Sequence, residues 1–202
     1  MAIKSGQLKE KTDYQAYILE MLRDENGYQI RPATSFDAGY GMDTEVLFNF
    51  LEATQSEALV KLEKLYKDKT RQTILNYINN EINKRNRCLL DVLKHGVEFD
   101  NGVTLNLMYR KPANSFNPKA EALYQQNVFS VMEEVYHKAD ERVDLVLFLN
   151  GLAIFAVELK CNTSGQTYKD AIKQYKEERD ATTRLFKTKV GVFAAFAMDL
   201  NE

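Results

Sequence analysis

The sequence predicts an α/β fold, in which a mixed central sheet is flanked by helices and carries a helical insertion. Residues 143–149 and 152–157 are apolar on both faces, and strands of this kind are usually buried between layers of helices. The turn-forming pair Asn150-Gly151 lies between them and predicts a hairpin. Residues 43–95 contain no Pro or Gly, and their apolar residues recur at helical spacing, which predicts helices.

Length and charge limit the kind of protein this is. The chain has 202 residues, of which 45% are hydrophobic, and this is enough apolar material for one domain with a core. It contains 27 Lys and Arg against 29 Asp and Glu, for a formal net charge of -2. Freestanding, sequence-independent nucleic-acid binders are usually basic. Any DNA must therefore be delivered by another part of an assembly or held by a local patch.

Nothing in the sequence indicates export or membrane insertion. Two cysteines, Cys88 and Cys161, are too few for a disulfide framework, and no CxxC pair is present to hold zinc. The N-terminus lacks the apolar segment of a signal peptide. No apolar run reaches the roughly 18 residues of a transmembrane helix. We therefore expect a cytoplasmic protein that has no membrane partner.

Element by element, helices dominate the first half of the chain. Apolar residues at helical spacing predict a helix over residues 13–25, which Gly27 can end. Residues 28–42 contain Pro and Gly breakers and predict strand and loop. The stretch from 43 to 94 is long for one helix and predicts two or three.

The second half of the chain changes to the two-residue period of strands. Asn101-Gly102 lies between short apolar segments and predicts a second hairpin. Strands are predicted over 128–136 and 190–197, and a helix over 164–180.

Three ionisable side chains lie at the ends of the main hairpin that are farthest from its turn. Asp144 is near the start of one strand, and Glu158 and Lys160 are at the end of the other. Burying unpaired charge is costly, so these groups need partners. A salt bridge between Lys160 and one carboxylate would be a structural explanation. A divalent metal held by both carboxylates would be a functional one.

The register of the hairpin decides whether Asp144 and Glu158 can share a metal. A two-residue loop with no bulge would place the two carboxylates on opposite faces of the sheet. A three-residue loop with a bulge at Gly151 would pair Phe148 with Leu152 and bring both carboxylates to one face. We predict this bulged register, or a compensating bulge elsewhere.

A pair of hard carboxylates suits Mg²⁺, which prefers oxygen ligands and keeps several waters. Such a metal polarises a phosphate oxygen and lowers the pKa of a bound water. Lys160, which would share the face of the carboxylates, could orient or help deprotonate the attacking water, or stabilise charge in the transition state.

At these residues the sequence resembles the PD-(D/E)xK nuclease superfamily. More narrowly, it resembles the N-terminal endonuclease region of the R (restriction and motor) subunit of type I restriction enzymes. Residues 142–151, 157–160 and 170–176 carry the resemblance, which is strongest over about 127–198. Residues 14–28 also resemble the opening of the family.

The resemblance implies a single nuclease domain over residues 1–202, with a PD-(D/E)xK restriction-endonuclease-like fold. In this interpretation the catalytic core covers about 97–198, and the helical insertion covers about 43–95. The complete subunit of this family also carries an ATP-driven DNA translocase. This chain has no GxxxxGK[ST] phosphate loop. We therefore expect it to be a fragment of a longer motor subunit, with ATP needed only by the motor.

The resemblance also assigns roles to residues. It implies that Asp144 and Glu158 ligate the metal, and that Lys160 is the catalytic lysine. Gln174 would face the site from the following helix and help to position DNA or the lysine. Basic residues on that helix are candidate phosphate contacts, namely Lys169, Lys173, Lys176 and Arg179.

The implied function is that of a type I site-specific deoxyribonuclease, an Mg²⁺-dependent endonuclease that hydrolyses DNA phosphodiester bonds. Its partners would be double-stranded DNA and the methyltransferase and specificity subunits. Two alternatives remain open. One is a catalytically silent module of the same fold that docks DNA or a partner. The other is a standalone Mg²⁺-dependent nuclease.

Three positions depart from the family pattern. The usual Pro before the aspartate is Val143, which is a good strand residue. The glutamate of the first helix corresponds to Gln15, which argues against a third acidic ligand and for a single metal ion. The Tyr four residues after the glutamine is Glu178, although Tyr175 adjoins Gln174.

Overall fold

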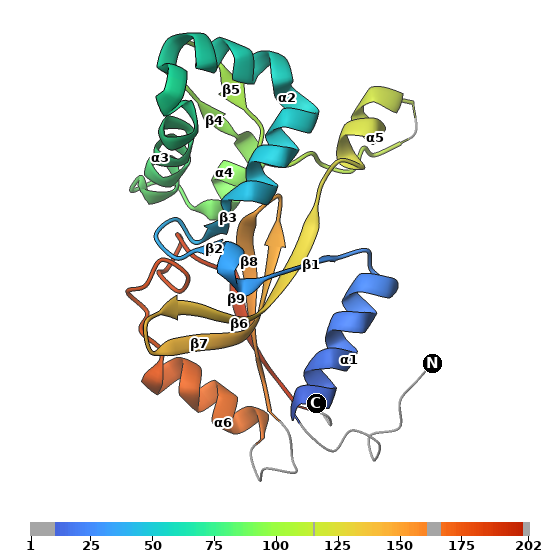
Figure 1. Ribbon diagram of the computed structural model, residues 1–202, viewed down its shortest axis with the longest axis vertical. Helices are drawn as coiled ribbons and strands as arrows, with labels where there is room; N and C mark the ends of the chain where they lie inside the picture. Colours follow the sequence, from blue (N-terminus) through green and yellow to red (C-terminus); the bar gives the residue numbers. More distant parts are fainter. Residues whose placement is uncertain (1–10, 115, 161–166, 200–202) are drawn as a thin grey trace.

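A mixed sheet forms the centre of the molecule in the computed structural model, which describes residues 11–114, 116–160 and 167–199 (Figure 1). Within these residues seven strands pair in the order β1-β6-β7-β8-β3-β2, and β9 also pairs with β8. β1 is parallel to β6, β9 is parallel to β8, and the other pairs are antiparallel. The strands are β1 (Gln29–Arg31), β2 (Phe36–Asp37), β3 (Met42–Asp43), β6 (Phe129–Lys138), β7 (Glu141–Leu149), β8 (Leu152–Leu159) and β9 (Ala194–Met198). The mixed sheet that the sequence predicts is confirmed.

Helices occupy the predicted regions of the chain. They are α1 (Lys11–Asp24), α2 (Thr44–Tyr66), α3 (Thr70–Asn83), α4 (Leu89–His95), α5 (Pro118–Tyr124) and α6 (Tyr168–Lys173), with short 3-10 turns η2 (Ala33–Ser35) and η3 (Lys67–Lys69). A π-helical segment, η5 (Gln174–Glu178), continues α6. Of the first four residues of the predicted 164–180 helix, 164–166 lie outside the described residues and Thr167 caps α6.

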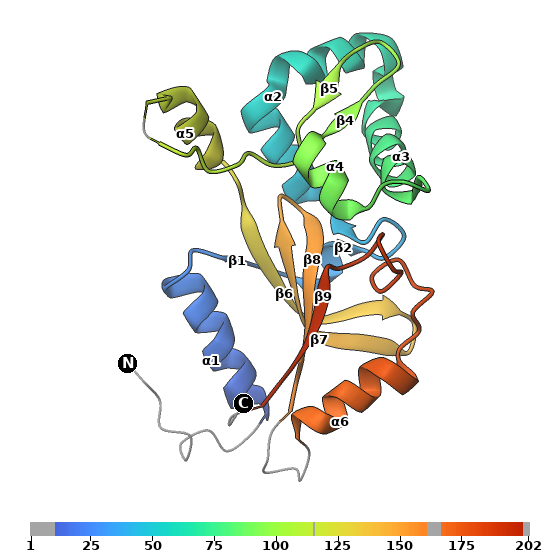
Figure 2. The same ribbon diagram turned by 180° about the vertical axis from the view of Figure 1, so that it is seen from behind.

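Helices α1 and α6 lie on opposite sides of the sheet (Figures 1 and 2). On one face, Tyr14 and Ile18 of α1 pack with Val131 and Leu145 of the sheet. On the other face, strand residues such as Val146 pack with residues of the segment that follows α6. The strands β7 and β8 are therefore buried on both faces, as their continuous apolar runs predict.

The residues between β3 and β6 form a mostly helical unit beyond one end of the sheet (Figure 1). Its helices α2, α3 and α4 confirm that the long stretch is two or three helices. The short hairpin of β4 (Val97–Glu98) and β5 (Thr104–Leu105) confirms the Asn101-Gly102 turn. Fully buried residues from α2 and α3 pack in one cluster with Leu152 and Ile154 of β8, so this unit shares its core with the sheet.

The predicted three-residue loop of the main hairpin is wrong. Leu149 pairs with Leu152 and Phe148 with Ala153, so the loop consists of the two turn residues alone. Both have positive φ, 49° at Asn150 and 83° at Gly151. This is the backbone that matches the right-handed twist of two paired strands, which explains why the short loop is preferred.

The alternative, a compensating bulge elsewhere in the hairpin, is confirmed. Leu147 pairs with Phe155, whereas its neighbour Phe148 pairs with Ala153, so Ile154 is the extra residue in β8. The carbonyl of Ile154 accepts a hydrogen bond from the backbone N–H of Phe193 at 2.8 Å. The bulge therefore leaves no unpaired carbonyl at this buried position, and it restores the face-sharing that the site requires.

The last strand is shorter than predicted. It begins at Ala194, whereas the apolar pattern predicted a strand from residue 190. The backbone N–H groups of Val190 and Gly191 both donate to the carbonyl of Lys187, at 3.0 and 2.8 Å. These donors are used in a turn, so they are not available to a sheet ladder.

Candidate active site

Asp144 and Glu158 meet on one face of the sheet. The ladder pairs Val146 with Ala156 and ends with Leu145 and Val157, and the same register continued by one residue places Asp144 opposite Glu158. Directly opposite residues in an antiparallel pair point to the same face. Both residues are buried, with 3% and 4% of their surface exposed. The Asp144 carboxylate accepts a hydrogen bond from the backbone N–H of Leu159 at 2.7 Å, which fixes its position beside β8.

Lys160 lies between a carboxylate and an amide. Its Nζ donates to Oε1 of Glu158 at 3.2 Å and to Oε1 of Gln174 at 2.8 Å. Its own backbone N–H donates to the carbonyl of Met198 in β9, so the main chain at Lys160 is held by the sheet. The structure thus brings together the four residues that the sequence selected for the site. It also contains the Lys160–Glu158 salt bridge that the structural explanation anticipated.

The donor atoms at this place fit a hard divalent cation. Asp144 and Glu158 bring carboxylate oxygens from neighbouring strands, which is the ligand type that Mg²⁺ prefers. Among the described residues, no cluster of three or more His, Cys, Asp or Glu is arranged to hold a metal. Gln15, at the position of the family's first-helix glutamate, donates to Glu133 at 3.0 Å. Water, substrate or main-chain oxygens would therefore have to complete the coordination of a metal held by these two carboxylates.

Comparison with known proteins identifies the family. The sequence matches the family described as "Type I restriction enzyme R protein N terminus" over residues 7–198. The chain belongs to this family. It is also 28% identical over 121 residues to a protein of Methanocaldococcus jannaschii that is provisionally named as the endonuclease subunit of the type I restriction enzyme MjaIXP. That alignment covers 59% of this chain but 12% of the relative, so the chain spans a small part of the relative's length.

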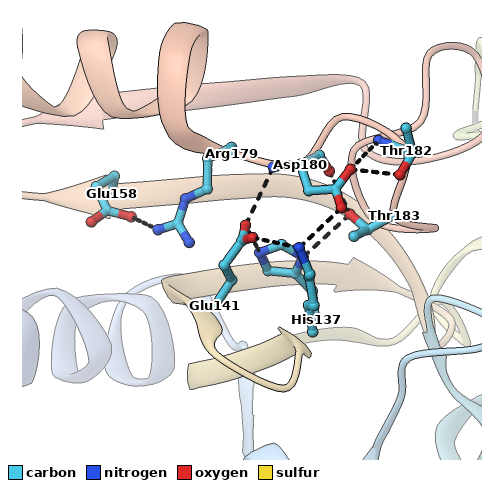
Figure 3. A network of polar contacts seen from close by, with 8 residues as sticks. His137, Glu141, Glu158, Arg179, Asp180, Thr182 and Thr183 are labelled. Carbon is cyan, nitrogen blue, oxygen red and sulfur yellow. Dashed lines mark hydrogen bonds and ion pairs between the residues drawn. The ribbon is translucent and has the colours of Figure 1, made fainter.

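In this R-protein N-terminal chain, Arg179 also contacts the site. A terminal nitrogen of its guanidinium, Nη2, lies 2.7 Å from Oε2 of Glu158 (Figure 3). The two side chains are 6% and 5% exposed, so this is a buried ion pair. The sequence placed Arg179 in a row of basic residues for DNA. In the structure its guanidinium is turned inward to the Glu158 carboxylate.

Tyr175 is a further residue beside the carboxylates. Its hydroxyl is buried and has no hydrogen-bond partner within the described part of the chain. Burial, followed by the nearby charge of Glu158, raises the pKa of Tyr175 above its usual value. It is therefore a neutral phenol at the edge of the site, with an unused O–H group.

The π-helical segment explains why Arg179 points toward Glu158 and does not point outward with the lysines of the predicted basic row. The backbone N–H of Arg179 donates to the carbonyl of Gln174, five residues earlier, at 3.0 Å. In an α-helix the N–H that bonds to the Gln174 carbonyl belongs to the residue four positions later. A π-helical turn contains one extra residue, so here the donor is Arg179, five positions later. Helical periodicity alone gives no signal for such a turn. π-helical turns are frequent at functional sites.

A polar network borders the site at the start of β7. His137 lies 3.2 Å from the Thr183 hydroxyl and 3.6 Å from a carboxylate oxygen of Glu141 (Figure 3). Burial, followed by the nearby charge of Arg179, lowers the pKa of His137. Glu141 also accepts from the backbone N–H of Asp180 and from Lys138. Since these contacts tie β7 to the segment after η5, the network holds in place the chain that carries Arg179.

A surface pocket lies beside this network. A pocket of about 280 Å³ is lined by Asp140, Glu141, Arg142, Gln174 and Arg179. Gln174 and Arg179 are the residues that bond Lys160 and Glu158, so they separate the pocket from the buried carboxylates.

The three lysines of the predicted basic row remain on the surface. Lys169, Lys173 and Lys176 are exposed on α6 and η5, where they can reach a phosphate backbone.

None of the helices in the described part of the chain has the length and apolar character that a membrane span requires.

Proposed function

We propose that this chain is the Mg²⁺-dependent endonuclease domain of a type I restriction enzyme, with a PD-(D/E)xK fold and a site formed by Asp144, Glu158, Lys160 and Gln174. The observation that supports this most directly is the pairing of two buried carboxylates on adjacent strands, with the ammonium of Lys160 bonded to one of them. Family membership and the relative named as an endonuclease subunit point the same way.

In this proposal Asp144 and Glu158 hold the metal. A bound Mg²⁺ would polarise a phosphate oxygen and favour deprotonation of water. The hydrogen bond from Leu159 N–H fixes one Asp144 oxygen, so that carboxylate is oriented before the metal arrives. Because β7 and β8 are buried on both faces, the two carboxylates are carried by strands that are packed between layers.

Lys160 would act on the reacting phosphate. Glu158 and Gln174 hold its ammonium with two hydrogen bonds, which restrict it to one place. A fixed cation beside a phosphodiester stabilises the negative charge that accumulates as water attacks phosphorus and the P–O bond breaks. Gln174 contributes by positioning the lysine.

Family membership supports a proposal for the substrate and partners. We propose double-stranded DNA as the substrate, and the methyltransferase and specificity subunits as the partners. The net charge of -2 supports a division of labour in which other parts of the assembly hold the DNA and this domain cuts it. The motor that uses ATP would lie in another part of the protein.

The test is loss of cleavage with retention of assembly. In the assembled restriction enzyme, Asp144→Asn and Lys160→Ala should each lower the rate of plasmid cleavage at least about a thousandfold. ATP hydrolysis on the same DNA should stay within twofold of wild type. Glu177→Gln is the matched control, because this carboxylate lies on the adjacent η5 and its side chain is 64% exposed.

The outcomes separate the proposal from its alternatives. Cleavage at the wild-type rate by either site variant would reject the nuclease assignment and leave the docking module. Efficient Mg²⁺-dependent cleavage by the 202-residue chain, with no other subunit and no ATP, would instead support a standalone nuclease.

A further inference from the structure

The carboxylate that would bind the metal already has a cation on each oxygen. Oε1 of Glu158 accepts from Lys160, and Oε2 accepts from Arg179 at 2.7 Å. All three side chains are less than 10% exposed. A metal that binds through Glu158 needs at least one of these oxygens, so it would compete there with a cation that is already bound.

Arg179 is the partner that can leave. Lys160 has a second acceptor in Gln174, and its main chain is fixed by the sheet. Arg179 follows η5, at the start of an extended segment, with φ -74° and ψ 134°. Its buried Nε has no hydrogen-bond partner among the described residues. Its guanidinium carbon lies 6.0 Å from the centroid of the Tyr175 ring, which is a distant contact. Its guanidinium is therefore held in place mainly by Glu158.

There is also a place for the displaced side chain. Arg179 lines the open pocket of about 280 Å³ together with Glu141, so the guanidinium can turn outward without crossing packed apolar residues. Glu141 on the wall of this pocket is a carboxylate that offers a second partner. A side chain with two charged destinations, one inside and one in an open pocket, has the features of a two-position element.

We propose that Arg179 is a displaceable cation that occupies Glu158 until a divalent metal takes that carboxylate, after which its guanidinium turns into the pocket. This inference rests on the proposed function. It makes Arg179 a positioning residue: it keeps Glu158 paired while no metal is present, and it lowers the apparent metal affinity by the cost of breaking its ion pair.

The chain offers a matched control for the loss of one positive charge. Arg142 lines the same pocket, but its Nε pairs with Glu134 at 2.7 Å, and its side chain is 55% exposed. Removing Arg142 changes the local charge by the same amount and leaves the Glu158 contact intact. Any difference between Arg179 and Arg142 variants therefore reports on the contact with Glu158.

Metal binding without catalysis is the decisive measurement. Mn²⁺ would be titrated into the 202-residue chain by electron paramagnetic resonance, which counts the free ion. We expect Arg179→Gln to lower the Mn²⁺ dissociation constant about tenfold, because the competing cation is gone. Arg142→Gln should change it less than twofold. Equal affinities of the two variants, or weaker binding by Arg179→Gln, would overturn the inference.

A measurement on the wild-type chain covers the case in which Arg179→Gln does not fold. The ¹⁵N–¹H signal of the Arg179 Nε group, assigned by its absence from Arg179→Lys, would be followed during addition of Mg²⁺. We expect it to shift with the same dissociation constant as the metal site. A signal that stays in place at saturating Mg²⁺ contradicts displacement.

Asp144→Asn distinguishes this inference from the function on which it rests. This variant should lose Mn²⁺ binding at the site. If it binds Mn²⁺ as tightly as wild type, the metal site itself is wrong and both proposals fail. If it loses binding while Arg179→Gln shows no gain, the metal site stands and the inference about Arg179 fails alone.

Discussion

The amide oxygen of Gln174 lies 2.8 Å from the ammonium of Lys160, across the junction between a helix and the end of a strand. Gln174 begins η5, and Lys160 directly follows β8. This hydrogen bond ties the segment after β8 to the start of η5. In the proposed site, Gln174 would set the position of the lysine.

Replacing Gln174 should therefore reduce the rate of cleavage and leave DNA binding nearly unchanged. We expect Gln174→Ala to lower the cleavage rate of the assembled enzyme about tenfold, the equivalent of one hydrogen bond to a charged group. The DNA dissociation constant should stay within twofold. Gln174→Glu keeps an acceptor oxygen and should lose less. A larger effect on DNA binding than on rate would show that Gln174 contacts DNA and does not position the lysine.

Periodicity predicted that Asp144, Glu158 and Lys160 lie together, whereas Gln174 was implied only by the family resemblance. In two buried strands joined by a short turn, Asp144 and Glu158 must lie at the same end of the hairpin. The cost of burying charge then requires that they share a face. The location of the bulge could not be predicted, since a bulge at Gly151 and one at Ile154 both bring the carboxylates to one face. The sequence constrains that outcome more strongly than the bulge position.

Arg179 shows where sequence periodicity fails. A π-helical turn arises from local hydrogen bonding, and here it moves Arg179 from the predicted basic row into contact with Glu158. Val190 shows a second limit, because an apolar residue in a turn resembles one in a strand until its backbone partner is known. Both failures concern where backbone N–H groups donate, which the order of side chains does not specify.

Gly151, in the turn of the main hairpin, should be far more sensitive to substitution than Gly102, because the main chain of Asp43 packs closely against it. Both have positive φ, 83° and 77°, which costs about 1–2 kcal/mol for a residue with a Cβ. A Cβ at Gly151 would also lie 2.3 Å from the carbonyl oxygen of Asp43, whereas one at Gly102 would meet nothing within 4 Å. Urea unfolding should show a loss above about 4 kcal/mol for Gly151→Ala and about 1 kcal/mol for Gly102→Ala. Equal losses would mean that the backbone around Gly151 yields to the methyl group.

Asp180 should contribute stability that depends on pH. Hydrogen bonds from the hydroxyl and backbone N–H of Thr182, followed by the ion pair with Lys138, lower the pKa of Asp180 to about 2. A carboxyl with a lowered folded-state pKa stabilises the fold above its unfolded value, near 3.8, and this contribution is lost as the pH falls toward about 2.

Urea unfolding at several pH values measures this contribution. Asp180→Asn should be less stable than wild type at pH 6, and the difference between the two should shrink as the pH is lowered to 3. Thr182→Val, which removes the hydroxyl donor, should flatten the pH dependence of the wild-type carboxyl. A difference that stays constant from pH 6 to pH 3 would exclude Asp180 as the titrating group.

The exposed lysines of α6 and η5 should determine part of the salt dependence of DNA binding. Each phosphate contact that is lost lowers the slope of log K against log salt by about 0.9. We therefore expect replacement of Lys169, Lys173 and Lys176 by Ala to lower that slope by about 1 to 3 in the full-length R protein, depending on how many of the three lysines contact a phosphate. Ca²⁺ in place of Mg²⁺ would prevent cleavage during the titration.

A second set of exposed lysines separates this local patch from the general effect of charge. Lys61, Lys64 and Lys69 belong to the helical unit beyond the other end of the sheet, on α2 and η3. Their replacement removes the same total charge from the protein, but it removes no contact beside the carboxylates. The slope should then change by less than about 0.5. If both triple variants lower the slope equally, the DNA does not follow α6, and the path of the substrate to Lys160 must be sought along another surface.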